Sequence, residues 1–189
     1  MENFTTGTLE KDCGGTQFAD FKDAIKSGLE EYLDGLKKAV DGLTPGELRW
    51  QPALTSNFIS WIVWHMARVE DRWVNRVLRS DVELWIRDGW HEKFGMSKEA
   101  HGYGETKAQI REMPEVAMSD LLAYFDAVRQ PTLAYLERMT SADIEASYAH
   151  PPRLTNITGS WILGHILVEE SQHLGQVAYI RGMIRGRSK

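Results

Sequence analysis

The chain has 189 residues, and its 22 lysines and arginines against 27 aspartates and glutamates give a formal net charge of -5. The single cysteine, Cys13, excludes an internal disulfide and a cysteine-rich zinc module, because both need several thiols. The mild acidity argues against a nucleic-acid-binding protein, which normally carries a basic surface. A chain of this length suits one folded domain over residues 1–189, with residues 1–17 loosely ordered.

The sequence also indicates a soluble, cytoplasmic protein. Its N-terminal stretch lacks the basic start and the apolar segment of a secretory signal, and the single cysteine suits a reducing compartment. The longest apolar run, residues 58–64, is far shorter than the roughly 20 residues of a membrane span. We therefore expect neither a membrane nor a nucleic acid as a partner.

Apolar residues recur at helical spacing in four long segments, which predicts four helices. These predicted helices span residues 18–43, 56–79, 121–139 and 158–185. Ser56 or Asn57 can cap the second helix, and Pro131 predicts a kink in the third. Residues 81–113 contain glycines and large aromatics, which favours short helices and an ordered loop. No segment predicts a strand, so we expect an all-α four-helix bundle with this ordered excursion between its second and third helices.

One sequence pattern recurs after one hundred positions. Leu54-Thr55, Ser60-Trp61-Ile62, His65 and Glu70 return as Leu154-Thr155, Ser160-Trp161-Ile162, His165 and Glu170. An internal duplication of helix pairs explains these matches in one register, and it places the second and fourth helices in equivalent, facing positions. Chance similarity between two amphipathic helices is the alternative.

The residue types that bind metals gather on these two helices. Glu169 and His173 lie one turn apart on one face of the last helix, where both side chains can reach one ion. His65 on the facing helix supplies a further imidazole. Two imidazoles and a carboxylate are the ligand count of a catalytic zinc site, and non-haem iron uses the same ligand types. The pattern therefore predicts a metal site of His65, Glu169 and His173.

Four neighbours are predicted to support this site or line its pocket without binding the metal. They are His165, Gln172, Gln176 and Trp61. His165 lies two turns before His173, roughly 12 Å away along the helix, so the two do not readily share one ion. The other three are placed to orient the ligands or to pack against them.

Other interpretations of these residues stay open. His65 alone is typical of a hydrogen-bonded core histidine, and Glu169 with His173 is typical of a surface ion pair. Glu170 and His173 form the Glu-x-x-His element of di-iron bundles, but the first repeat has Trp73 where a second histidine is needed. A di-iron protein is therefore disfavoured.

The remaining candidates carry no predicted chemistry. Three histidines lie in loop-like segments and are expected to be solvated: His91, His101 and His150. A charged cluster partly describes a solvated helix face: Arg68, Glu70, Asp71 and Arg72. Cys13 has no partner motif, and the sequence shows no phosphate-binding loop, nucleophile elbow or Ser-His-Asp signature.

Three stretches carry a resemblance to a known family: SWIVWHMARVEDRW, LWIRDGWHEKFGM and EESQHLGQVAYIRGM. From about Phe18 to Arg185 the sequence resembles the DinB-like (DinB/YfiT-like) superfamily of bacterial metal-binding four-helix bundles. That superfamily includes the N-terminal domains of mycothiol-dependent maleylpyruvate isomerases and the bacillithiol transferases. Its members place one His on helix two and, on the last helix, a His or Glu four residues before the His of an H-x-G-Q segment. The matching residues here are His65, Glu169 and His173.

The resemblance implies a divalent metal, zinc or nickel first and iron or manganese as alternatives, since the carboxylate favours a harder ion. It also implies a low-molecular-weight thiol cosubstrate. The metal-bound thiolate would attack a small electrophile, giving S-transfer or isomerisation, and residues 85–103 would cover the site. A homodimer is a further expectation. The competing hypotheses are a non-catalytic metal-binding stress protein and a helical dimerisation module.

Overall fold

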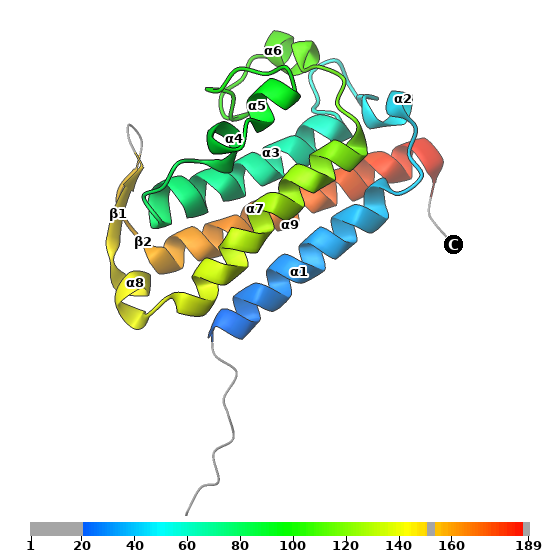
Figure 1. Ribbon diagram of the computed structural model, residues 1–189. Helices are drawn as coiled ribbons and strands as arrows, with labels where there is room; N and C mark the ends of the chain where they lie inside the picture. Colours follow the sequence, from blue (N-terminus) through cyan, green and yellow to red (C-terminus); the bar gives the residue numbers. More distant parts are fainter. Residues whose placement is uncertain (1–20, 151–153, 187–189) are drawn as a thin grey trace, which may run out of the picture.

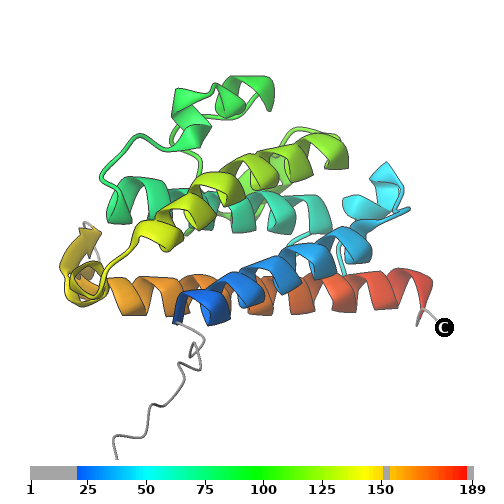
Figure 2. The ribbon, with the colours of Figure 1, turned by 60° about the horizontal axis from the view of Figure 1, so that its bottom comes forward.

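The computed structural model describes residues 21–150 and 154–186, and four long helices form its frame. They are α1 (Phe21–Val40), α3 (Ile59–Asp71), α7 (Met118–Arg138) and α9 (Gly159–Arg185). Figures 1 and 2 show α1 lying along α9 and α3 along α7, and α3 also packs on α9. The predicted all-α four-helix bundle is confirmed.

An apolar stripe holds α1 in the bundle. In α1 the buried residues are Leu29, Leu33, Leu36 and Val40, which recur every three or four positions and form one face. A capping box at Thr44 then starts the short helix α2 (Pro45–Leu48), where the sequence predicts a break. Pro131 lies inside α7, and the helix continues through it.

The second long helix departs from its prediction at both ends. Its N-cap is the buried Phe58, whose side chain makes no capping hydrogen bond, so Ser56 and Asn57 do not cap it. Towards its C-terminus the helix widens into the π-helical segment η1 (Arg72–Leu78). The widened turn brings the amide of Asn75 to the buried carboxylate of Asp71, at 2.8 Å from Nδ2 to Oδ1.

A small hairpin corrects the expectation that the chain has no strands. β1 (Ser147–His150) and β2 (Leu154–Thr158) pair antiparallel, with Tyr148 opposite Ile157. The hairpin follows the short helix α8 (Ser141–Glu145) and leads into α9. Strands of four and five residues are too short for an alternating pattern to stand out, and the buried Ile157 packs into the core.

The excursion between the second and third long helices forms as predicted. It contains α4 (Leu84–Arg87), α5 (Trp90–Lys93) and α6 (Lys107–Glu112), and it lies over α3 and α7 (Figures 1 and 2). Trp85 and Phe94 are buried there, with ring centroids 5.7 Å apart. The excursion therefore has an aromatic core that is continuous with the bundle.

Three of the four residues in the charged cluster are buried, which corrects the prediction that the cluster partly forms a solvated helix face. Arg68, Glu70 and Asp71 are each at most 1 % exposed. Arg68 donates to Glu83 at 2.6 Å and to the carbonyl of Ala100 at 3.1 Å. Asp71 accepts hydrogen bonds from the first backbone amides of α4. These groups tie the start and the middle of the excursion to α3, and burial is tolerated because each charge has a partner.

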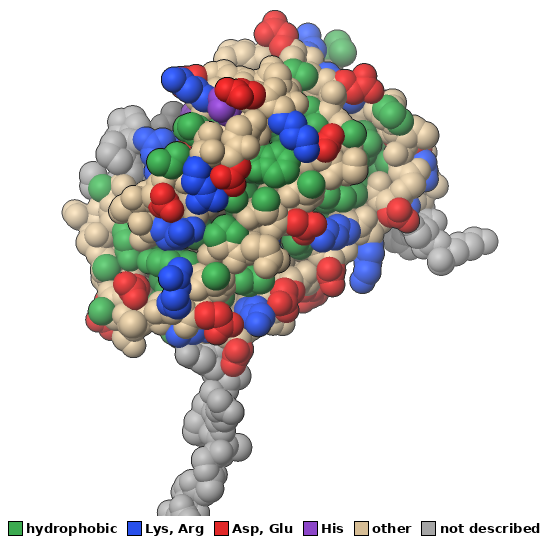
Figure 3. Space-filling model, viewed as in Figure 1, with side chains coloured by type: hydrophobic (Ala, Val, Ile, Leu, Met, Phe, Trp, Pro, Cys, Tyr) green, Lys and Arg blue, Asp and Glu red, His purple; other side chains and the backbone are tan. Residues whose placement is uncertain are grey.

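None of the helices among the described residues has an apolar stretch long enough to cross a lipid bilayer. On the face shown in Figure 3, acidic and basic side chains are interspersed and no large region carries one sign.

Candidate metal centre

The structure brings the three predicted ligands together between α3 and α9. His65, Glu169 and His173 each offer one ligand atom, and these atoms lie within 4.8 Å of one another. Nε2 of His173 is 3.3 Å from Oε2 of Glu169, and the two imidazole rings have centroids 5.0 Å apart. His65 is buried, while the other two are half-buried and open to the surface. The helical spacing supplies the pair on α9, and the packing of α3 on α9 adds the third residue.

The surroundings of His65 fix its orientation. Nδ1 lies 3.2 Å from the backbone carbonyl of His101, so this nitrogen carries the proton and donates it, and Nε2 keeps its lone pair. The indole of Trp61 stacks on the ring, with centroids 4.8 Å apart and planes 13° from parallel. Burial, together with the neighbouring His173, lowers the pKa of His65 to about 4. The imidazole is therefore neutral at pH 7, the form that binds metals.

The pair on α9 is oriented in the same way. Nδ1 of His173 lies 3.1 Å from Oε1 of Gln176, which accepts its proton and leaves Nε2 free. The imidazole of His173 beside it lowers the pKa of Glu169, so this residue is a carboxylate at neutral pH. Both imidazoles thus turn Nε2 toward one carboxylate and have an acceptor behind them, as metal-binding histidines usually do. The donor set fits a divalent metal.

The predicted supporting residues divide into those that touch the site and one that does not. Trp61 and Gln176 contact ligand imidazoles as described. His165 lies with Nε2 3.8 Å from Oε1 of Glu169, so it flanks the carboxylate from the other side. Gln172 is exposed and makes no hydrogen bond within the described part of the chain. No contact among the described residues therefore supports the predicted role of Gln172.

Sequence reasoning missed the loop that holds His65 in place. Gly102 has a φ of 80°, and a Cβ added there would overlap Nδ1 of His65. Glu105 accepts hydrogen bonds from the Trp61 indole at 2.9 Å and from the Gly102 amide at 3.1 Å. The sequence feature that could have identified this loop is the pair of glycines on either side of Tyr103. Both have a positive φ, which glycine adopts without strain.

Two other histidines are less exposed than predicted. His91 is half-buried, with Nδ1 3.0 Å from the carbonyl of Trp85. His101 is also half-buried, and its Nδ1 accepts from the backbone amide of Tyr103 at 3.0 Å. The expectation that both are solvated is wrong, because the aromatic excursion packs around them. The side chain of His150 lies outside the described part.

The two sequence repeats adopt matching geometry. Trp161 stacks on His165 with centroids 4.6 Å apart and planes at 15°, as Trp61 stacks on His65. Trp73 meets His165 edge-on at 5.4 Å and 84°, where the metal site has His173 against His65 at 5.0 Å and 89°. The first repeat therefore holds an aromatic side chain where the second holds a ligand, which agrees with a mononuclear site.

The chain was also compared with known proteins. The profile of the family described as Mycothiol-S-transferase matches residues 24–186. Among curated proteins, no significant match was found.

Two solved structures share the fold. A conserved protein from Enterococcus faecalis has a TM-score of 0.80 and 20% identity, over 89% of this chain and 99% of that chain. The colibactin self-resistance protein ClbS, solved with dsDNA, has a TM-score of 0.50 and 14% identity, over 84% of this chain and 94% of that chain. At these identities the likenesses show the fold alone. Because the family profile spans most of its length, the chain belongs to the mycothiol-S-transferase family, within the DinB/YfiT-like superfamily.

Proposed function

We propose that this protein is a metal-dependent S-transferase that joins the sulfur of mycothiol to a small electrophile. Membership of the mycothiol-S-transferase family supports the thiol. One observation supports the proposed metal dependence. The ligand atoms of His65, Glu169 and His173 lie within 4.8 Å of one another, and the Nδ1 atom of each imidazole has a hydrogen-bond acceptor. Zinc or nickel suits this donor set best, with iron or manganese as alternatives.

In this proposal the ligands and the residues that orient them have separate roles. A divalent metal at this site would lower the pKa of a bound thiol and make thiolate available at neutral pH. His65 and His173 would hold such an ion through their Nε2 atoms, and the one negative charge of Glu169 would leave the loaded site with a net positive charge. The His101 carbonyl and the Gln176 amide fix the two rings, and Trp61 covers one face of His65. In the proposed transfer the thiol would release its proton to solvent, and its sulfur would bond to the electrophilic carbon as the bond from that carbon to the leaving group breaks.

Metal analysis tests the site. Protein stripped with a chelator and reloaded with zinc or nickel should hold about one ion per chain, as expected of a mononuclear site. His173→Ala should lose the metal and remain folded by circular dichroism. His165→Ala, on the same helix, should keep it, since His165 is not a proposed ligand. Loss of the metal in His165→Ala with retention in His173→Ala would show that the ligand assignment is wrong.

An activity assay tests the reaction. The metal-loaded protein is mixed with a fluorogenic electrophile and with mycothiol, bacillithiol or glutathione in turn. We expect conjugation above background with mycothiol and none in the His173→Ala variant. Stoichiometric metal without conjugation by any thiol would favour the non-catalytic metal-binding protein. Absence of metal after reloading would favour the helical dimerisation module.

A further inference from the structure

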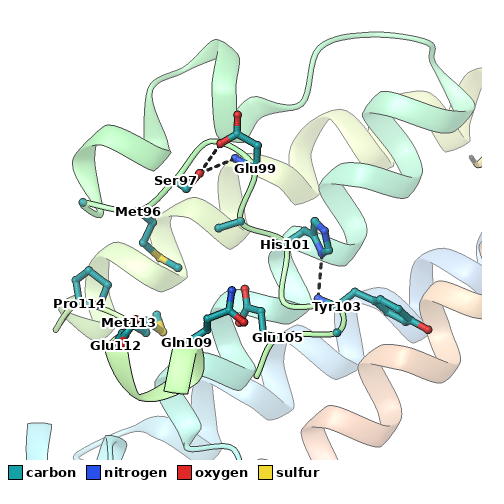
Figure 4. A pocket seen from close by; sticks show the side chains of 13 residues that line it. Met96, Ser97, Glu99, His101, Tyr103, Glu105, Gln109, Glu112, Met113 and Pro114 are labelled. Carbon is teal, nitrogen blue, oxygen red and sulfur yellow. Dashed lines mark hydrogen bonds between the residues drawn. The ribbon is translucent and has the colours of Figure 1, made fainter. Parts of the chain in front are cut away.

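A cavity lies on the excursion, beside the metal centre. It has a volume of about 440 Å³ and is formed between residues 95–105 and the stretch from α6 to Pro114. Figure 4 shows Glu105 and Gln109 next to each other on one side of it, with Met96, Met113 and Pro114 together on another side. A volume of this size is in the range of sites that bind small molecules.

The cavity and the metal centre share one loop. His101 lines the cavity and presents its backbone carbonyl to Nδ1 of His65. Glu105 also lines the cavity, and its carboxylate binds the indole of Trp61, which stacks on His65. A molecule in the cavity therefore lies against the same segment, residues 101–105, that orients the buried ligand of the metal.

The chemistry of the lining selects its occupant. Three carboxylates line the cavity, those of Glu99, Glu105 and Glu112, and no lysine or arginine is among the described residues that line it. Such a wall repels carboxylates and phosphates but accepts hydrogen bonds from hydroxyl groups. The carbonyl of the Gln109 side chain accepts bonds from the backbone amide and hydroxyl of Thr106, which leaves its NH₂ group to donate to a ligand oxygen.

The two methionines supply the other half of a carbohydrate site. Met96 and Met113 both line the cavity, and Met113 is only 4 % exposed. Their thioether side chains are apolar and adaptable, so they can pack against the C–H face of a sugar or cyclitol ring. Hydroxyl-accepting carboxylates together with apolar side chains in one cavity match an uncharged ring that carries many hydroxyls.

We propose that this cavity binds the uncharged, hydroxyl-rich sugar–inositol part of the thiol cosubstrate and selects against thiols that carry carboxylates, such as glutathione. The inference rests on the proposed function, because it names the part of the molecule that binds away from the metal. The sulfur reaches the metal centre while the polyol lies against the far side of the 101–105 loop.

The test measures binding without metal and without turnover. The probes are S-methylmycothiol and S-methylglutathione, whose sulfur cannot become a thiolate, titrated into metal-free protein by calorimetry. We expect S-methylmycothiol to bind at least about tenfold more tightly than S-methylglutathione, a discrimination worth about 1.4 kcal/mol. In the double variant Glu99→Lys, Glu112→Lys this ratio should fall by about tenfold. Both side chains are exposed, so the substitutions should leave the fold intact.

A matched variant controls for net charge. Glu92→Lys, Glu115→Lys makes the same charge change at two exposed residues that do not line the cavity, and it should keep the native ratio. Equal ratios in the two double variants, or no binding of S-methylmycothiol by the native protein, would overturn the proposal. Because no metal is present, a failure of the catalytic proposal leaves this result unchanged, and the reverse also holds.

Discussion

Glu70 and Glu170, one hundred positions apart in the sequence, share a single arginine. Nη2 of Arg129 donates to Oε2 of Glu70 at 2.9 Å and to Oε1 of Glu170 at 2.7 Å, and all three side chains are at most 3 % exposed. Arg129 lies on α7, so it links the equivalent positions of α3 and α9 through a third helix. Glu170 directly follows the proposed ligand Glu169, and the buried triad therefore holds α9 next to the metal centre.

Replacing Arg129 should lower the free energy of unfolding much more than replacing the carboxylate of Glu170. Burial, together with the neighbouring Glu70, raises the pKa of Glu170 well above its usual value, which favours its neutral acid form. Glu170→Gln should then lower the free energy of unfolding by under about 1 kcal/mol. Arg129→Met strands the charge of Glu70 and should cost about 3–5 kcal/mol. Urea unfolding measures both, and equal losses would contradict this protonation state.

The four long helices could be predicted from the sequence because each has an apolar stripe of helical period. The convergence of Glu169 and His173 also follows from spacing, and the repeat places His65 opposite them. Local patterns do not show which distant group neutralises a buried charge. Arg68 and Asp71 resemble a solvated face until the partners from the excursion, Glu83 among them, are known. The two short strands and the 101–105 loop were missed for the same reason, since tertiary contacts fix both.

The two glutamines near His173 should differ in their effect on metal binding. Gln176 accepts the Nδ1 proton of His173, whereas Gln172 is exposed and makes no hydrogen bond among the described residues. Gln176→Leu should weaken zinc affinity about 10- to 100-fold, the usual loss when such an acceptor is removed. Gln172→Leu is the matched control and should change the affinity little. Competition with a chromogenic chelator measures both, and equal affinities would exclude an orienting role for Gln176.

Two glycines in the excursion, Gly102 and Gly104, allow the effect of a clash with His65 to be separated from the effect of backbone strain. Gly102 and Gly104 have φ of 80° and 71°, so alanine at either position should cost about 1–2 kcal/mol in unfolding free energy. A Cβ at Gly102 overlaps Nδ1 of His65, but at Gly104 it meets no atom within 4 Å. Gly102→Ala should therefore also weaken zinc binding by at least about tenfold, while Gly104→Ala leaves it unchanged. Similar affinities in the two variants would mean that the loop does not position His65.

Metal-free protein should lose stability between pH 6.5 and pH 4. The unfolded chain protonates His65 near its ordinary pKa of 6.5, whereas burial lowers the folded pKa to about 4. The unfolded state thus binds more protons in this window, so the contribution is fully present above pH 6.5 and is lost as the pH falls. The full loss is about 3 kcal/mol at pH 4. Urea unfolding in the presence of chelator should show a shallower decline in His65→Gln, and identical slopes would contradict the low pKa.

The matching geometry of the two repeats predicts that a second metal site can be built in the first repeat. His165 already occupies the position of His65, and Val69 and Trp73 occupy the positions of Glu169 and His173. The variant Val69→Glu, Trp73→His should therefore raise the metal content from about one to about two ions per chain.

The new site should bind its ion about 10- to 100-fold more weakly than the native site, because Arg76 stands where Gln176 orients His173. Trp73→His alone is the control, since it adds an imidazole but no carboxylate, and it should hold only the native ion. Metal analysis and chelator titration distinguish the variants, with circular dichroism to show that each is folded. A folded double variant with a single ion would mean that the resemblance between the repeats ends at their aromatic stacking. A second ion in the double variant alone would show that the side chains at positions 69 and 73 together decide which repeat binds metal.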